Sequence, residues 1–328
     1  MGDPGSSLPR QIYRPRSRVL RATVITVVAL LLVIVIAATV IGWFEGPTFL
    51  HPVRRPLTQS LIHEADQYLA PIRYTREQFD VIANDGTPLR GWAIAPANAN
   101  GNWLLLFHGV SDNRAGMIGP ARILLEAGYS VVMMDSRAHG ESGGAIATYG
   151  WLERNDAHAV VSALETSKHP KHIFALGESM GGGIALQTAA ADPRIEAVIA
   201  ESPFASLHEA AYDYAGLHKS ILLGKTLFAS GALAMLYHGQ RISGLPASRI
   251  SAEAAVAQRA FPILLICDEA DMILPCRHAE RIFNAAVGPK ELWRVPGAYH
   301  TGALGVEPQE FRRRILAFLA PLAASPSR

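Results

Sequence analysis

Residues 172–192 read HIFALGESMGGGIALQTAAAD, and this stretch is the strongest indication of the fold in the sequence. The apolar run 173–176 is typical of a buried strand, and the small-residue run 182–191 is typical of a helix. Between them, Ser179 is the centre of a Gly-Glu-Ser-Met-Gly turn. Glycines are needed there because a side chain would collide with so tight a backbone, and such a turn presents the serine hydroxyl beyond the sheet edge. Ser179 is therefore the candidate nucleophile.

Strand-like and helix-like segments alternate on both sides of this turn. Apolar runs at residues 103–107 and 129–135 predict buried strands. Further strands are predicted within residues 195–202, 261–271 and 291–297. Segments that predict helices lie at residues 121–129, 151–167 and 308–323. Ahead of them, residues 78–96 predict two strands joined by an Asp-Gly turn. This alternation predicts an α/β fold with a doubly wound, mostly parallel sheet.

Residues 203–259 interrupt the alternation. They read as helical pieces broken at Gly and Pro, without a convincing strand. A helical insertion at this place predicts a short cap over a site at the strand ends, and the alternative is ordinary helix packing in a long crossover. Its apolar side chains could line an acyl pocket, contact a bilayer or form plain core; they are Leu222, Leu223, Leu227, Phe228, Leu233, Met235 and Leu236.

The N-terminal part of the chain has the character of a membrane anchor. Residues 22–44 carry no charge, and as a helix they would span about 34 Å, enough for a hydrocarbon core of about 30 Å. A secretory signal peptide is the alternative, but its apolar region is usually only about 7–15 residues long. Five arginines lie in the basic arm, residues 1–21, so the positive-inside rule predicts a cytoplasmic N-terminus and an extracytoplasmic body. Residues 45–75 predict a linker with one short helix, and residues 76–325 form the main domain.

A serine nucleophile needs a base and an orienting acid, which in this arrangement follow it in the order Ser, Asp or Glu, His. Asp271 follows an apolar strand, where such an acid should lie, and Asp268 and Glu269 are nearby competitors. His300 lies in the loop after the last strand, whereas His278 falls on a helix, where a solvated role is expected. His300 would accept the proton of the serine, and Asp271 would orient the imidazole and stabilise its charged form.

The negative charge that develops on a substrate carbonyl needs hydrogen-bond donors. We expect the backbone N–H groups of Met180, directly after the nucleophile, and of Val110, in the loop after the strand at 103–107. A second G-x-S-x-G pattern occurs at residues 140–144, but it is separated from the preceding strand and no helix follows it. Its Ser142 is expected to lie in a flexible loop and not to act as the nucleophile.

The remaining composition excludes several classes of function. The basic residues are concentrated in the arm, so the body gives no reason to expect nucleic-acid binding. The sequence has no metal-ligand spacing and no phosphate- or dinucleotide-binding loop, so no metal or cofactor is expected. Cys267 and Cys276 bracket Asp271; outside the cytoplasm they could form a disulfide that holds the acid loop, and the alternative is two free thiols.

Five segments together resemble the α/β-hydrolase superfamily. They are FHGVSDNR (107–114), MMDSRAHGESGG (133–144), LGESMGGGIAL (176–186), CDEADMILP (267–275) and PGAYH (296–300). The sequence is most similar to membrane-anchored serine hydrolases with a short helical cap, of the serine aminopeptidase-like, ABHD and Bem46-like types. The resemblance covers about residues 76–325 and implies the α/β-hydrolase fold, with Ser179, Asp271 and His300 matching the catalytic triad.

The resemblance implies a serine-dependent acyl hydrolase of the carboxylesterase, lipase or thioesterase type, acting on a small or lipid-like ester. One alternative is a serine peptidase of the aminopeptidase type. It would need an acidic group for a free amine, for which the candidates are Glu141, Glu178, Glu201 and Glu209. The other alternative is a non-catalytic binding protein on a hydrolase scaffold.

Overall fold

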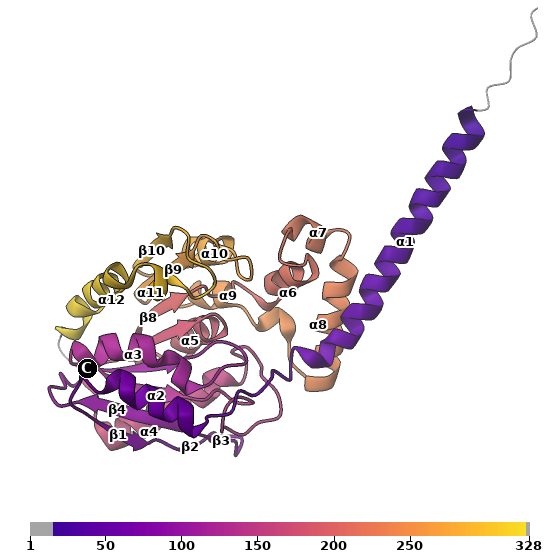
Figure 1. Ribbon diagram of the computed structural model, residues 1–328. Helices are drawn as coiled ribbons and strands as arrows, with labels where there is room; N and C mark the ends of the chain where they lie inside the picture. Colours follow the sequence, from indigo (N-terminus) through magenta and orange to yellow (C-terminus); the bar gives the residue numbers. More distant parts are fainter. Residues whose placement is uncertain (1–15, 326–328) are drawn as a thin grey trace, which may run out of the picture.

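The computed structural model describes residues 16–325, and an eight-stranded sheet forms the centre of the main domain (Figure 1). The strand order is β1-β4-β6-β5-β7-β8-β9-β10. All pairs from β6 to β10 are parallel, and β4 is antiparallel to both of its neighbours. The strands are β1 (Tyr74–Gln78), β4 (Gly91–Pro96), β5 (Trp103–Phe107), β6 (Ser130–Met134), β7 (Ile173–Glu178), β8 (Ile195–Glu201), β9 (Ile263–Asp268) and β10 (Lys290–Val295). The predicted doubly wound, mostly parallel sheet is confirmed.

Helices cover both faces of this sheet, because successive strand residues point to opposite sides. On one face, Leu105 and Val132 share a core with α4 (Glu153–Lys168), α5 (Met180–Ala191), α9 (Ala252–Val256) and α10 (Arg277–Ala285). On the other face, Leu104 and Val131 share a core with α2 (Gln59–Leu69), α3 (Ile118–Glu126) and α12 (Pro308–Ala323). The continuous apolar run of β5 follows from this double burial.

The shorter elements agree in part with the sequence predictions. The Asp-Gly turn joins β2 (Val81–Ile82) to β3 (Pro88–Leu89), as predicted. Residues 78–96 nevertheless form more than two strands, because β4 follows this hairpin and pairs with the earlier β1. Two 3-10 helices, η1 (Arg114–Met117) and η2 (Ala247–Arg249), and the short helix α11 (Ala303–Val306) complete the domain.

The insertion after β8 forms a helical cap. It contains α6 (Leu207–Ala215), α7 (Ile221–Lys225) and α8 (Ala229–Ser243), which lie away from the sheet and beside α1 (Figure 1). The cap has a small core of its own, which includes Leu207, Met235 and Leu236. The expected range 203–259 is too long at its C-terminal end, because α9 packs into the main core.

A single long helix, α1 (Arg16–Thr48), extends from the cap away from the main domain (Figure 1). It is long and apolar enough to cross a membrane and extends beyond the expected span of 22–44. Of the expected basic arm, residues 1–15 lie outside the described part of the chain. Residues 45–75 are not a free linker, because Leu50 and Leu69 are fully buried; the predicted short helix is α2.

Candidate active site

Ser179 occupies the turn between β7 and α5. Its backbone has φ 54° and ψ −118°, a strained conformation for a residue with a side chain. A Cβ atom at Gly177 would overlap the carbonyl oxygen of Gly181, and one at Gly181 would overlap the carbonyl oxygen of Phe107. The two glycines are therefore required by the close approach of β7, α5 and the end of β5.

The turn lies where the strand order reverses. From β5 the chain passes to β6 on one side and then to β7 on the other, so the loops after β5 and β7 leave in opposite directions. A crevice forms at such a switch point, at the carboxyl ends of the strands. A Cβ atom built at Gly109, in the loop after β5, would lie 3.7 Å from the Cβ atom of Ser179.

The structure brings Ser179, Asp271 and His300 together at this edge, from the loops after β7, β9 and β10. The Nε2 atom of His300 lies 2.8 Å from Oγ of Ser179. The Nδ1 atom of His300 lies 2.6 Å from Oδ2 of Asp271. If Nδ1–H donates to the carboxylate, Nε2 is left to accept the serine O–H, which is the tautomer that a general base requires.

Asp271 is held in its charged form. Its Oδ1 atom accepts the N–H groups of Ile273 at 2.7 Å and Leu274 at 2.9 Å. Burial by itself would raise the pKa of Asp271, but the hydrogen bond and charge of His300 and the Leu274 N–H group lower this pKa below its usual value. The carboxylate therefore stabilises the folded protein at neutral pH, and this contribution is lost as the pH falls through the lowered pKa.

The two competitors for the acid role lie elsewhere. Asp268 is buried, and its Oδ2 atom accepts the Ser202 hydroxyl at 2.9 Å and the Gly302 N–H group at 3.3 Å. Asp268 thus supports the loop that carries His300, while Glu269 is exposed.

A second buried carboxyl group, whose supporting role the sequence analysis missed, holds the same loop. Oε1 of Glu201 accepts the N–H group of Ala303 at 2.9 Å. Burial, and then the charges of Glu178 and Asp268, raise the pKa of Glu201 well above its usual value. The sequence feature that could have indicated this role is the position of Glu201 at the end of β8, the strand next to the one that leads to Ser179.

The two expected oxyanion donors lie beside the nucleophile. Met180 is the first residue of α5, so its N–H group has no acceptor within the helix and lies at the positive end of the helix dipole. Val110 and Met180 both line the cavity that contains Ser179.

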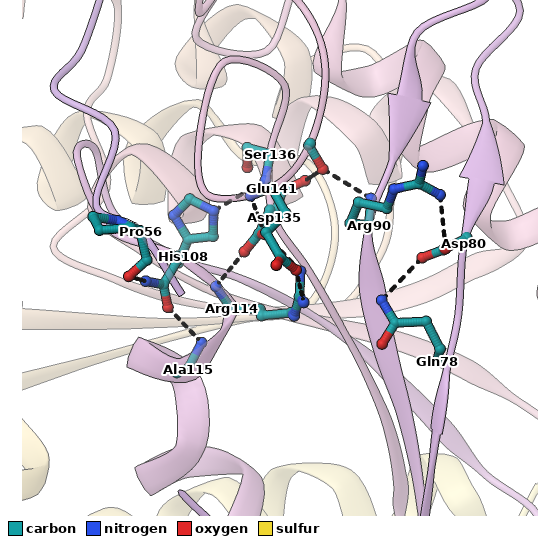
Figure 2. Close-up of polar contacts among 12 residues, drawn as sticks. Pro56, Gln78, Asp80, Arg90, His108, Arg114, Ala115, Asp135, Ser136 and Glu141 are labelled. Atoms are coloured by element: carbon teal, nitrogen blue, oxygen red, sulfur yellow. Dashed lines mark hydrogen bonds and ion pairs between the residues drawn. The ribbon is translucent and has the colours of Figure 1, made fainter. Parts of the chain in front are cut away.

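A network of buried polar side chains holds the loop that carries Val110 (Figure 2). His108 is fully buried, and its Nε2 atom accepts the N–H group of Ser136 at 3.0 Å. Arg114 donates from Nη1 to Oδ2 of Asp135 at 2.6 Å. Burial lowers the pKa of His108, so its ring stays neutral and can act as this acceptor. The loop is therefore fixed on both sides of Val110.

The second G-x-S-x-G pattern has a structural role. Ser142 is 1% exposed; its hydroxyl donates to the carbonyl oxygen of Asp135 at 2.7 Å and accepts the N–H group of Arg90 at 2.9 Å. The burial agrees with the expectation that Ser142 is not the nucleophile. The expectation of a flexible loop is wrong, because this hydroxyl joins two segments of the core.

The expected solvated role of His278 is also wrong. The side chain is 1% exposed; Nδ1 accepts the N–H group of Ala205 at 3.1 Å, and Nε2 lies 2.7 Å from Oδ2 of Asp213. Burial and the positive charge of Arg277 lower the pKa of His278 to about 3. The neutral ring joins the start of α10 to the cap helix α6.

Cys267 and Cys276 form a disulfide, with their Cα atoms 5.2 Å apart. The bond joins the end of β9 to the residue before α10 and encloses the loop with Asp271. The hypothesis of a bridge around the acid loop is confirmed. Closing a loop of about ten residues is worth roughly 2–3 kcal/mol of stability through loop entropy.

A cavity of about 380 Å³ opens beside Ser179. Its lining is mostly apolar, and Phe204, Leu207 and Met235 contribute to it from the cap side. Thr48 and Phe49, at the end of α1, line it as well. The seven cap residues singled out in the sequence therefore have different roles: Met235 lines this cavity, Leu236 is core, Leu222, Leu223 and Leu233 are exposed, and Leu227 and Phe228 are half-buried.

The fold and this site together define a class of protein, the α/β hydrolases, with a serine on a strand-to-helix turn and an acid and a histidine on later strand-end loops. Residues 99–231 match the Hydrolase_4 family, described as serine aminopeptidase, S33. The chain belongs to the α/β-hydrolase superfamily.

Known proteins of three kinds are similar to this chain. The uncharacterized protein Rv2307c of Mycobacterium tuberculosis (strain ATCC 25618 / H37Rv) is 30% identical over 224 residues, which cover 67% of this chain and 70% of that protein. The lysophosphatidylserine lipase ABHD12 of Danio rerio is 24% identical over 260 residues, which cover 73% of this chain and 63% of that protein. The solved structure of the Pyrococcus furiosus esterase Pf2001 has a TM-score of 0.66 at 23% identity and covers 83% of this chain and 99% of that chain, a likeness of the fold.

Proposed function

We propose that this chain hydrolyses carboxylic esters, with Ser179 as nucleophile, His300 as general base and Asp271 as the acid that orients it. The contacts of 2.8 Å and 2.6 Å that join these three side chains carry the proposal. A neutral serine hydroxyl is a poor nucleophile, and a histidine held in the correct tautomer is what activates it.

The reaction follows from this geometry. Oγ of Ser179 attacks the ester carbonyl carbon while its proton moves to Nε2 of His300. The bond from the carbonyl carbon to the alcohol oxygen then breaks, and His300 returns the proton to that oxygen. Water attacks the resulting acyl-serine in the same way, which releases the carboxylic acid and restores the serine hydroxyl.

The N–H groups of Val110 and Met180 are proposed to stabilise the negative charge on the carbonyl oxygen. The anchoring of the Val110 loop supports this role, because fixed donors need no reorganisation as charge develops. Removing one such donor typically lowers turnover by about 10²–10³-fold.

The apolar cavity supports an ester whose acyl part is apolar. The names of two relatives, a lysophosphatidylserine lipase and an esterase, are compatible with this class of substrate. In contrast, the family description names an aminopeptidase. Of the four glutamates that were candidates for binding a free amine, three have other contacts or are buried: Glu141 pairs with Arg114, Glu209 pairs with Lys225, and Glu201 is buried. Glu45 is the acidic side chain among the described residues that line the cavity, so an amine-binding role would fall to it.

A panel of substrates tests the proposed reaction. We expect the purified full chain to hydrolyse p-nitrophenyl esters with short and medium acyl chains and to leave amino-acid p-nitroanilides intact. Release of p-nitrophenol or p-nitroaniline is followed by absorbance. Faster hydrolysis of anilides with a free amine would instead favour the peptidase, and a Glu45→Gln change that abolished it would identify the amine-binding group.

We further propose that α1 anchors the protein in a membrane, with the N-terminus in the cytoplasm and the hydrolase domain outside. The packing of α1 on α8 supports a retained anchor over a cleaved signal peptide: Nδ1 of His238 lies 2.6 Å from the carbonyl oxygen of Trp43. The disulfide supports an extracytoplasmic domain, because such bonds persist in oxidising compartments.

A C-terminal fusion to alkaline phosphatase, which is active only outside the cytoplasm, tests the orientation. We expect an active reporter on a membrane-bound fusion of full length. A matched fusion after residue 21, ahead of the apolar span, should be inactive. An inactive reporter on a stable, inserted full-length fusion would contradict the proposed orientation.

A further inference from the structure

A second apolar cavity, of about 320 Å³, lies between α1 and the cap. Ile34, Ala38 and Ile41 line it from α1, and Phe228 and Ala232 line it from the cap. Four residues line both this cavity and the one beside Ser179; they are Glu45, Ala211, Tyr214 and Met235. The two spaces therefore adjoin each other at these side chains.

The second cavity lies at the depth of the proposed membrane span. Its α1 lining runs from Ile34 to Glu45, so almost all of it belongs to the uncharged segment 22–44, in the half nearer the hydrolase domain. At about 1.5 Å per residue, this lining extends for roughly 16 Å along the helix. In a bilayer, the far end of the cavity would therefore open toward the acyl chains of the leaflet next to the domain.

Helix α1 forms one side of this cavity and packs closely against the cap. A Cβ atom at Gly42 would overlap the carbonyl oxygen of Gly231, so the backbones of α1 and α8 approach as closely as small residues allow. The hydroxyl of Ser230 donates to the carbonyl oxygen of Val35 at 3.2 Å. Just beyond the helix, Leu50 is fully buried in the core of the cap.

The cap exposes large apolar side chains. Leu217 and Leu222 are each 68% exposed, and Leu233 on α8 is 47% exposed. Leu233 belongs to α8, which lies along α1 in Figure 1, whereas Leu222 belongs to α7 and Leu217 to the loop between α6 and α7. Apolar side chains clustered beside a membrane helix are stabilised when they insert into the bilayer interface.

We propose that the space between α1 and the cap is a lateral passage by which one long acyl chain of an ester dissolved in the bilayer reaches Ser179. The anchor helix then forms part of the substrate-binding site. The inference rests on the proposed ester hydrolysis, and it adds the substrate class: esters of a single long fatty acid that are presented by a membrane. Short, water-soluble esters would reach the serine through the first cavity alone.

A bulky side chain in the passage tests this inference. Ala37 lines the second cavity but not the first, so Ala37→Trp should obstruct the passage and leave the serine accessible. Ile36 is 53% exposed and lines neither cavity, so Ile36→Trp is the matched control on the same helix. Full-length proteins in phosphatidylcholine vesicles are assayed with p-nitrophenyl butyrate and p-nitrophenyl palmitate.

We expect Ala37→Trp to lower kcat/KM for the palmitate ester by about tenfold or more, since each buried methylene contributes roughly fourfold to binding. Its kcat/KM for the butyrate ester should stay within about twofold of the original protein, and the control should match the original protein on both esters. Equal loss on both esters, or loss on neither, would contradict a passage at this place. If the original protein does not hydrolyse the butyrate ester, the proposed function itself fails.

A cross-linking experiment tests the passage without changing any residue of the protein. A fluorophosphonate with a sixteen-carbon chain and a terminal diazirine is attached to Ser179, and the protein is illuminated and digested for mass spectrometry. We expect cross-links to residues 34–41 of α1 or to Phe228. Cross-links confined to the main domain would overturn the passage. Absence of labelling by both this reagent and a short fluorophosphonate would instead refute Ser179 as the nucleophile.

Discussion

Replacement of Ser179 by alanine is expected to lower ester hydrolysis by roughly 10⁵–10⁶-fold, the order of loss typical for a triad serine. Without Oγ no acyl-enzyme can form, and the remaining rate comes from substrate binding and the oxyanion donors. Initial rates with p-nitrophenyl butyrate measure the loss. Labelling by a fluorophosphonate should disappear in the same variant.

Ser142, the serine of the second G-x-S-x-G pattern, provides a matched control. Because the Ser142 hydroxyl makes two buried hydrogen bonds, Ser142→Ala should destabilise the fold by about 1–3 kcal/mol. Its folded fraction should still hydrolyse esters and bind the fluorophosphonate. Activity or labelling that survives in Ser179→Ala, or that disappears in folded Ser142→Ala, would refute the assigned nucleophile.

The change Asp271→Asn is expected to lower kcat by about 10⁴-fold with little change in the fold, because an amide can donate to Nδ1 of His300 and so favour the wrong tautomer. The lowered pKa of Asp271 means that the native group is a carboxylate at neutral pH, so the substitution also removes the charge that stabilises the imidazolium. Values of kcat over a range of pH measure the effect, and circular dichroism checks the fold.

Glu269 provides the control for this change. It lies two residues away and is exposed, so Glu269→Gln should leave kcat close to that of the original protein. If Asp271→Asn kept most of its activity, another carboxyl group would have to orient His300. A large loss of kcat in Glu269→Gln would assign that role to Glu269.

The sheet was predictable because its signals are local. The central parallel strands are buried on both faces, so their sequences are short apolar runs between turns, as in residues 103–107. The position of Ser179 was predictable for a similar reason, because the G-x-S-x-G pattern is a continuous stretch of five residues. Gly177 avoids a clash inside this stretch, with the carbonyl group of Gly181, whereas Gly181 avoids a clash with the carbonyl group of Phe107 at the end of β5. The order of Asp271 and His300 behind it could likewise be read from strand ends.

Predictions that depended on distant contacts were less successful. His278 was expected to be solvated on its helix, yet Asp213 from a remote segment contacts its ring. Ser142 was expected in a flexible loop because no helix follows its pattern, yet its hydroxyl accepts the N–H group of Arg90. The supporting role of Glu201 depends on its contact with Ala303, about a hundred residues away. Hydrophobic periodicity carries no information about such pairs.

The class of fold, the candidate nucleophile and the presence of an apolar helix can be read from the sequence, because each depends on the character of a short, continuous stretch. The carboxyl group that contacts His300, the pairing of the cysteines and the contacts of α1 are seen only in the folded chain. The turn at Ser179 thus identifies where a reaction could occur, whereas the cavity beside it is shaped by α1 and the cap, which are separated by more than a hundred residues of chain. Side-chain contacts across such separations depend on how the whole chain packs, and no local pattern encodes them.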